Sequence, residues 1–229
     1  MRLWPISFLG ALALLAALFP TGLSASSAPA VSFTGLNASD NFPGGAFSLG
    51  FEFSTNSAID VTALGFFDAD LVNPTYVGLD DCTGCGEVGI YNSTGTLLVS
   101  TTVTTSGTQV GDFIYATVPT TLLAAGQDYF IVAETGNSTY TFDTTGFSVN
   151  PNIDYIQDAY TNGSSLAFPT STDGITAVEG GGVFGPNFEE TTAASPVPEP
   201  SSLSLLALAL GLVAFCATRK RLNTTRFQD

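Results

Sequence analysis

The positions of the basic residues constrain this chain more than any other feature of its sequence. All five Lys and Arg residues lie at positions 2, 219, 220, 221 and 226, and the chain contains no His. The body between the two ends, residues 31–195, therefore carries Asp and Glu but no basic side chain. Because no salt bridge to Lys or Arg can form inside such a body, a buried carboxylate must be stabilised by backbone donors, hydroxyl groups or a bound cation.

This charge pattern excludes several classes of function. Nucleic-acid binding depends on Lys and Arg, which displace counterions from the phosphates. Serine hydrolases and papain-like proteases need a His as general base, and histidine metal sites need the same residue. We therefore expect a protein that is not an enzyme, binds no nucleic acid and holds no firmly assigned cofactor.

The N-terminus has the pattern of a secretory signal peptide. Arg2 precedes an apolar run from Ile6 to Phe19, and small residues follow as far as Ala30. A positive start, a short apolar run and a small-residue exit are typical of such peptides, which predicts a signal peptide over residues 1–30. Cleavage after Ala25 and cleavage after Ala30 both satisfy the small-residue rule, and an uncleaved N-terminal anchor is the alternative.

Three segments follow one another at the C-terminus. The motif Pro198-Glu199-Pro200 comes first, an uncharged and mostly apolar stretch runs from Leu203 to Thr218, and Arg219-Lys220-Arg221 follows. As a helix the apolar stretch would reach about 24 Å, and snorkelling basic residues can close the gap to a hydrocarbon core of about 30 Å. The positive-inside rule places the basic cluster in the cytoplasm as an anchor and the body outside. The sequence thus predicts a single C-terminal transmembrane helix.

This order of segments resembles the PEP-CTERM sorting signal of Gram-negative bacteria, over residues 197–222. The resemblance implies that an exosortase, a membrane protease-transpeptidase, recognises Pro198, Glu199 and Pro200 and removes the helix. The exported protein would be anchored transiently in the inner membrane and then passed to the cell envelope or an extracellular polysaccharide matrix. Residues 189–196 would form a linker and residues 223–229 a cytoplasmic tail. An ordinary C-terminal membrane anchor is the alternative.

The body predicts an all-β fold, because short runs of alternating apolar and polar residues recur along it. Several strands at this spacing favour a jelly-roll-like β-sandwich over residues 31–188, with the fold ending near Phe188. The expected strands are Phe47–Phe53, Ile59–Phe67, Glu87–Tyr91, Thr96–Val103, Phe113–Val118, Asp128–Ala133, Thr139–Phe142 and Ile153–Tyr160.

Strict alternation also predicts which side chains share a face of the second of these strands. Within Ile59–Phe67, Val61 and Ala63 are expected on one face and Leu64 on the other.

A second resemblance rests on the order and spacing of six segments. They are Ile59–Asp68, Glu87–Asn92, Gly95–Leu98, Phe113–Ala116, Leu122–Gly126 and Tyr129–Ala133. This pattern is similar to an uncharacterised β-sandwich domain common in PEP-CTERM proteins and in some surface polysaccharide-associated proteins. The resemblance covers roughly Phe47 to Glu134 and implies a fold without a known reaction. Where such domains often have His before Glu-Val-Gly, this chain has Cys85-Gly86, so no role of that His is carried over.

Two of the three cysteines form the sequence Cys82-Thr83-Gly84-Cys85, and Cys216 lies in the apolar C-terminal stretch. A local disulfide is the expected state of the pair in an exported protein. A redox or zinc role is the alternative. The surrounding segment is rich in Gly and Asp and does not begin a helix, which favours the disulfide.

Acidic residues gather on both sides of these cysteines. Calcium takes several oxygen ligands on flexible loops, and a cation would neutralise clustered carboxylates where Lys and Arg are missing. The segment does not match an EF-hand loop, so a solvated acidic loop is the alternative. The candidate calcium ligands are Asp68, Asp70, Asp80, Asp81 and Glu87.

The leading interpretation is an exported, exosortase-sorted envelope or matrix protein whose β-sandwich is structural or adhesive. A carbohydrate-binding module, with or without a requirement for calcium, is the alternative, with extracellular polysaccharide as its partner. Tyrosines would have to line such a site, because the only Trp is Trp4. Tyr91, Tyr115 and Tyr129 lie in expected strands, however, where packing is the expected role.

Overall fold

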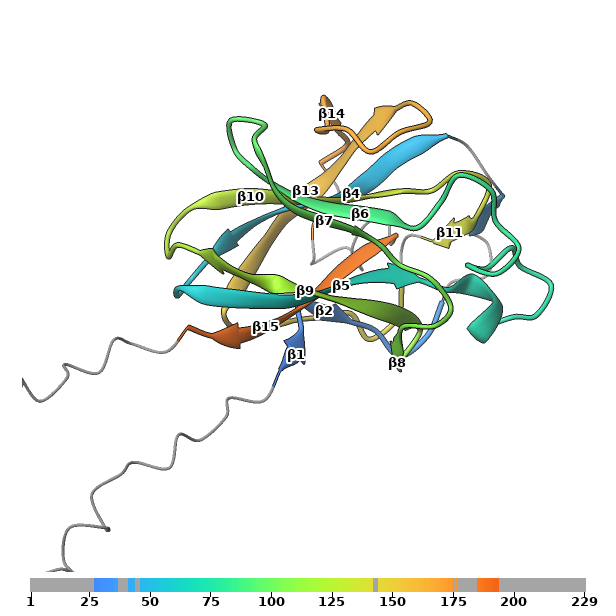
Figure 1. The fold of residues 1–229 in the computed structure, drawn as a ribbon, viewed down its shortest axis with the longest axis horizontal. Coiled ribbons are helices and arrows are strands. Elements are labelled where there is room, and N and C mark those ends of the chain that lie inside the picture. Colours follow the sequence, from blue (N-terminus) through green and yellow to red (C-terminus); the bar gives the residue numbers. More distant parts are fainter. Residues whose placement is uncertain are drawn as a thin grey trace, which may run out of the picture. The chain divides into compact units, whose positions relative to one another are not determined.

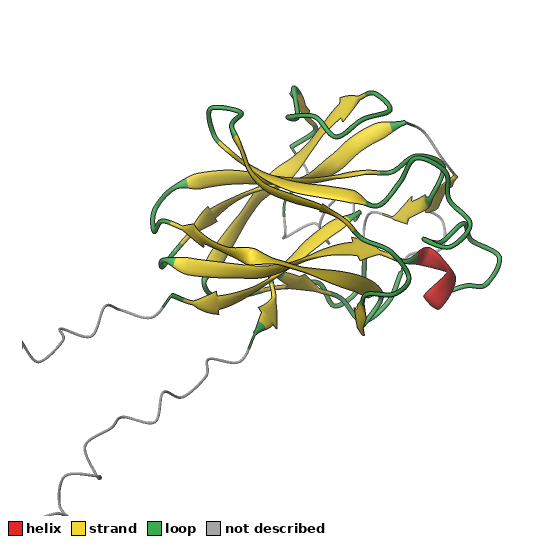
Figure 2. Ribbon diagram, in the orientation of Figure 1, coloured by secondary structure: helices red, strands yellow, loops and turns green. Residues whose placement is uncertain are grey.

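The computed structural model describes residues 27–36, 41–43, 46–141, 144–174, 176 and 185–193. Regular structure within these ranges is β, apart from one 3-10 turn (Figure 2). The strands are β1 (Ala28–Pro29), β2 (Val31–Ser32), β3 (Asn41–Pro43), β4 (Phe47–Thr55), β5 (Ile59–Phe67), β6 (Glu87–Asn92), β7 (Leu97–Thr102), β8 (Thr108–Val110), β9 (Phe113–Leu123), β10 (Asp128–Glu134), β11 (Thr139–Thr141), β12 (Ser148–Val149), β13 (Ile153–Asn162), β14 (Ser171–Thr172) and β15 (Pro186–Thr192). The expected all-β class is confirmed.

Two antiparallel sheets form the two layers of the domain (Figure 1). One has the strand order β1-β15-β5-β9-β8, and the other has the order β14-β13-β4-β10-β6-β7. Two small pairs, β11 with β3 and β12 with β2, complete the described pairing. The expected hairpin forms where β6 pairs with β7 and the Gly95 N–H donates to the Asn92 carbonyl.

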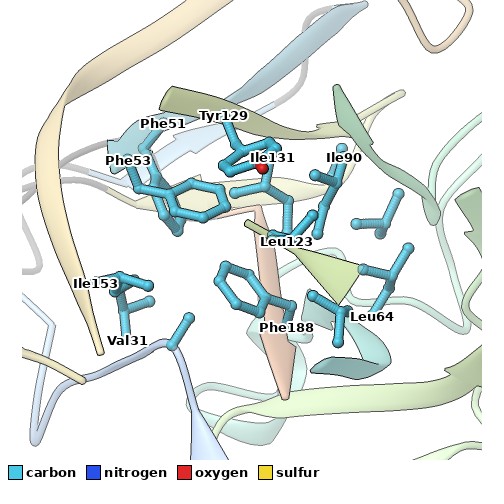
Figure 3. Packing of buried hydrophobic residues seen from close by; sticks show 14 of the residues in the cluster. Val31, Phe51, Phe53, Leu64, Ile90, Leu123, Tyr129, Ile131, Ile153 and Phe188 are labelled. Atoms are coloured by element: carbon cyan, nitrogen blue, oxygen red, sulfur yellow. The ribbon is translucent and has the colours of Figure 1, made fainter. Parts of the chain in front are cut away.

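The main hydrophobic core takes side chains from both sheets. Phe188 of β15 is fully buried, and its ring centroid lies 5.0 Å from that of Phe53 of β4. Figure 3 shows Phe188 among side chains that belong to the two layers, Leu64 and Ile131 included. A buried aromatic ring excludes a large apolar area from water, so these contacts hold the two layers together.

A second, smaller apolar cluster lies on the other face of the five-stranded sheet. It contains Phe67 and Phe113, and Phe33 packs against both rings with centroid distances of 6.0 and 5.7 Å. The chain before β4 therefore covers part of this face and makes both faces of β5 apolar.

A β-bulge in β5 changes the face on which its side chains lie. β15 pairs Glu190 with Val61 and Glu189 with Ala63, which leaves Thr62 as one extra residue in β5. Val61 and Leu64 consequently share the main core, whereas Ala63 belongs to the second cluster. The strict alternation predicted for this strand was wrong, because an extra residue shifts the two-residue period by one.

Both ends of the described domain extend beyond the predicted boundaries. β1 lies inside the range 1–30 that the sequence assigned to the signal peptide, and Ala30 is fully buried with its N–H 2.8 Å from the Phe188 carbonyl. At the other end β15 continues to Thr192, four residues into the predicted linker. Cleavage after Ala25 would keep β1 in the exported domain, whereas cleavage after Ala30 would remove it.

Candidate functional site

The long connection from β5 to β6 carries both the cysteines and the clustered acids. It begins with a 3-10 turn at Ala69–Leu71, and hydrogen bonds fix it to its surroundings. The Thr139 N–H donates to the Val77 carbonyl at 2.9 Å, and the Val77 N–H donates to the Thr139 hydroxyl at 3.1 Å. The Gly86 N–H donates to the Glu134 carbonyl at 3.1 Å. The connection is therefore held against the end of β10 and the start of β11.

The structure joins Cys82 and Cys85 in a disulfide. The loop between them contacts the turn that follows β10, where the Thr83 N–H donates to the Asn137 side-chain carbonyl at 2.5 Å. Gly136 in this turn has a φ of +51°, and a Cβ there would collide with the carbonyl oxygens of Thr83 and Gly84. The close approach of the two loops thus requires glycine at this position.

Asp68 and Asp70, two of the five candidate calcium ligands, lie beside Gly78, and a third, Asp80, lies near Asp70. A Cβ on Gly78 would lie 2.6 Å from Asp68 Oδ1 and 2.5 Å from Asp70 Cγ. Asp68 is buried, and its Oδ1 accepts a 2.6 Å hydrogen bond from the Leu79 N–H. Burial, together with the neighbouring Asp68 and Asp80 carboxyls, raises the pKa of Asp70 to about 6. Asp70 Oδ1 is itself buried without a hydrogen-bond partner.

The other two candidates do not join this group. Asp81 is exposed, and Glu87, at the start of β6, lies near Glu134 at the end of β10. Burial first, and then the charge of Glu87, raises the pKa of Glu134. Among the described residues, no three or more His, Cys, Asp or Glu side chains are arranged as a group that could hold a metal ion.

Replacing Glu134 with Gln should stabilise the domain at neutral pH and leave it unchanged in acid. The folded pKa of Glu134 lies above its unfolded value, so its charge destabilises the folded state at pH 7, and this cost disappears as the pH falls through the folded pKa towards the unfolded one. The melting temperature of Glu134→Gln should exceed that of the wild type by a few degrees at pH 7, since 1 kcal/mol corresponds to about 2–4 °C in a domain of this size.

Thermal melts followed by circular dichroism at pH 7 and pH 4 would measure this difference. Asp154→Asn, in the exposed start of β13, is the matched control and should show no comparable gain. Equal melting temperatures for Glu134→Gln and the wild type at pH 7 would contradict a raised pKa of Glu134 in the folded state.

The three strand tyrosines Tyr91, Tyr115 and Tyr129 do not form an aromatic platform for a sugar. Tyr91, Tyr115 and Tyr129 are buried, as their places in the expected strands predicted. The Tyr129 hydroxyl accepts a 2.9 Å bond from the Ala124 N–H, and Tyr91 packs edge-on against Phe168. These rings therefore stabilise the fold.

Sequence patterns did not reveal an open groove at the end of the domain where the β6–β7 turn meets the β9–β10 connection. The groove has a volume of about 460 Å³, with Leu98 and Leu122 among its apolar lining and Asn92 and Asp128 among its polar lining. Leu122 is 62% exposed. Leu98 lies in the expected strand Thr96–Val103 and Leu122 beyond the expected end of Phe113–Val118, so only the tertiary arrangement brings them together.

Sequence patterns also did not predict the burial of two polar residues. Asn187 in β15 is fully buried and bonds Val31 through both of its side-chain polar atoms, at 3.2 and 2.8 Å. Glu190 is buried as well, with Oε1 accepting from the Asn152 amide at 2.8 Å. Both lie in a segment that composition alone marked as the end of the fold or as linker.

The sorting residues Pro198, Glu199 and Pro200 and the basic cluster Arg219-Lys220-Arg221 lie outside the described residues, as do the expected transmembrane stretch and residues 1–26 of the signal peptide. In the part of the chain that the structure does describe, no helix is long and apolar enough to span a membrane.

Comparison with known families gives two matches. Residues 35–178 match the family described as Domain of unknown function (DUF4082), and residues 196–221 match the PEP-CTERM protein-sorting motif. No curated protein and no solved structure matches the chain. The first match covers more than half of the chain, and the second covers the sorting segment that the sequence predicted. The chain therefore belongs to the DUF4082 family and carries a PEP-CTERM motif, which makes it an exported substrate of an exosortase.

Proposed function

We propose that the exported domain is a non-enzymatic structural or adhesive component of the cell envelope or the extracellular matrix. The observation that carries this proposal is the charge of residues 31–195, where every ionised side chain is a carboxylate. The sorting motif delivers this domain to the cell surface. A uniformly acidic surface keeps a protein soluble and hydrated next to anionic cell surfaces, which suits a component embedded in a hydrated matrix.

The fold supports the same role. Consecutive strands of six or more residues change sheet except from β6 to β7 and from β10 to β13, since β4, β6, β7, β10 and β13 belong to one sheet whereas β5, β9 and β15 belong to the other. We infer from this alternation that the domain is a jelly-roll-like sandwich, an architecture that occurs in capsid and lectin domains. The acid-rich connection from β5 to β6 is held by hydrogen bonds at Val77 and at Gly86. This is expected of a rigid structural unit rather than of a lid that closes over a substrate.

Genetic complementation in the native host tests the matrix role. A strain without this chain should form biofilms or flocs of lower cohesion and retain less extracellular polysaccharide. The full chain should restore both properties, whereas a chain ending at residue 196, and therefore without the sorting signal, should not. Unchanged cohesion and polysaccharide retention in the deletion strain would contradict the proposal.

A second candidate function is a calcium-dependent carbohydrate-binding module. The observation in its favour is that Asp68 and Asp70 lie beside Gly78 and Asp80 lies near Asp70, because carboxylate oxygens are the ligands that calcium prefers and the body has no Lys or Arg to neutralise them. As they lie in the structure these side chains do not form a metal-binding group, so calcium would have to draw them together. A glycan array probed with the exported protein, with calcium and with EDTA, separates the two candidates. Specific glycan binding only with calcium supports the carbohydrate-binding module, and no binding in either condition supports the structural role.

Calcium should raise the melting temperature at pH 7 if the second candidate is correct. Calcium binds the ionised carboxylates, so its effect should weaken at pH 5, where the raised pKa of Asp70 leaves this carboxyl mostly protonated. EDTA should reverse the gain, and Asp70→Asn should abolish it. Asp81→Asn, which changes an exposed acid of the same connection, is the matched control.

The competing outcome has a signature of its own. In a solvated acidic loop, calcium and EDTA leave the melting temperature unchanged, while Asp70→Asn is more stable than the wild type at pH 7. This follows because a carboxyl whose folded pKa lies above its unfolded value costs stability at every pH above that value. Such a result would contradict the calcium site.

A further inference from the structure

One side of the domain exposes the edges of both sheets. β7 is the last strand of the six-stranded sheet, and no described strand pairs with its outer edge. In the other sheet β8 pairs with β9 only from Phe113 to Tyr115, so the rest of β9 also has a free edge. Exposed leucines lie on this side, with Leu97 44% and Leu122 62% exposed.

Most of the remaining edges of the two main sheets are protected in ways that β7 is not. β14 pairs with β13 only at Ala159 and Tyr160, and the free part of β13 carries the exposed charge of Asp154. β1 and β14 are two residues long and β8 is three, and β1 contains Pro29. The free part of β9 contains Pro119, which has no N–H to donate. β7 extends over six residues, Leu97–Thr102, without proline or charge. Short length, proline and charge are usual means of blocking edge-to-edge pairing, and β7 has none of them. A β-bulge is a further means, and the one in β7, at Leu98, leaves Val99–Thr102 in regular register with β6.

Charge distribution indicates which partner this edge can accept. No charged residue lies between Glu87 and Asp112, so the hairpin of β6 and β7 is neutral from Val88 onward. Of the 20 acidic residues, only Glu199 and Asp229 lie outside residues 31–195, and that body has no Lys, Arg or His. A cationic partner would be drawn to the carboxylates elsewhere, whereas a second copy is repelled from them and can approach only where they are missing.

We propose that β7 is a self-association edge, on which a second copy of this chain pairs its own β7 in antiparallel orientation about a two-fold axis. Main-chain hydrogen bonds would join the two six-stranded sheets into one continuous sheet, and a two-fold axis uses the same patch on both copies. The contact would also cover Leu97. A single strand pair is at the small end of specific interfaces, so the dimer depends on protein concentration and suits a crowded surface. This inference goes beyond the proposed function and does not depend on it.

Cysteine cross-linking of the full chain at the cell surface tests the proposal. In a Cys216→Ser background, where Cys82 and Cys85 are paired with each other, Ser100→Cys or Thr102→Cys places one free thiol on β7. A short bismaleimide tolerates either pairing register. We expect at least fivefold more cross-linked dimer from these variants than from Thr172→Cys, a matched exposed position on β14 at the opposite edge of the same sheet.

Two other results of the cross-linking experiment would contradict the proposal. Equal cross-linking from β7 and from Thr172→Cys would show that copies meet without using this edge. Conjugates between the β7 thiol and a protein of different mass, in place of the dimer, would show that another partner occupies it. Neither result bears on biofilm cohesion, so failure here is distinguishable from failure of the matrix role.

A charge placed on β7 provides the second measurement. Ser100→Asp sets two carboxylates against each other across the two-fold axis and should lower the dimer fraction of the exported protein in sedimentation velocity at least tenfold. Thr172→Asp is the control and should change nothing, and thermal melts verify that both variants fold. Dimerisation of the wild type should increase with salt, because salt screens the repulsion between two acidic copies. A decrease with salt, or full dimerisation of Ser100→Asp, would overturn the proposal.

Discussion

A fragment cut to residues 35–178, the part that matches the DUF4082 family, should fail to fold cooperatively, whereas residues 27–193 should give a single sharp thermal transition. The shorter fragment lacks β15, which lies between β1 and β5 in the five-stranded sheet. Without it β5 loses one of its two partner strands from Ile59 to Phe66. The main core also loses Phe188, and the space it leaves removes contacts that are not replaced.

Circular dichroism melts of the two fragments measure this difference. A point variant separates the contribution of the core from that of the strand: Phe188→Ala in residues 27–193 should cost about 3–5 kcal/mol, as is usual for a buried Phe. Leu122→Ala is the control, and since Leu122 is largely exposed its effect should stay within about 0.5 kcal/mol. A sharp transition from residues 35–178 would show that β15 is dispensable.

Replacing Pro198, Glu199 and Pro200 together with Ala should prevent removal of the C-terminal tail. The match to the PEP-CTERM motif includes these residues, and we expect the exosortase to recognise them, since proline also restricts the backbone of this segment. Intact mass of the protein recovered from its host, with the cell-bound and medium fractions measured separately, gives the result. The wild type should lack everything after about Pro200, and the variant should retain Leu203 to Asp229 in the cell-bound fraction.

A matched control lies directly beside the motif. Ser201→Ala with Ser202→Ala leaves Pro198, Glu199 and Pro200 unchanged and should be processed like the wild type. Wild-type protein that keeps its tail would make the C-terminal segment a plain membrane anchor. The same spectra give the N-terminus, which we expect at Ser26, because cleavage after Ala30 would remove β1 and the buried Ala30 from the fold.

Local patterns were sufficient for the features that depend on one segment at a time. Alternation located the long strands such as β4 and β10 to within a few residues, because each has one face in the core. The hairpin of β6 and β7 was evident from its Asn92 and Gly95 turn residues. The sorting segment was identifiable for a similar reason, since its three parts follow directly in the chain.

The sequence by itself determined the all-β class, the sorting motif and the acidic character of the body, because composition and local order specify all three. Only the tertiary structure decided the rest. The bulge at Thr62 moved Leu64 to the same side as Val61, which depends on the register with β15. β15 itself lies in a polar segment that becomes a strand through its neighbours β1 and β5, and Asp70 and Glu87, close in sequence, were separated into different acidic groups by the path of one loop. Long-range pairing is a property of two segments at once, so neither segment alone carries its signal.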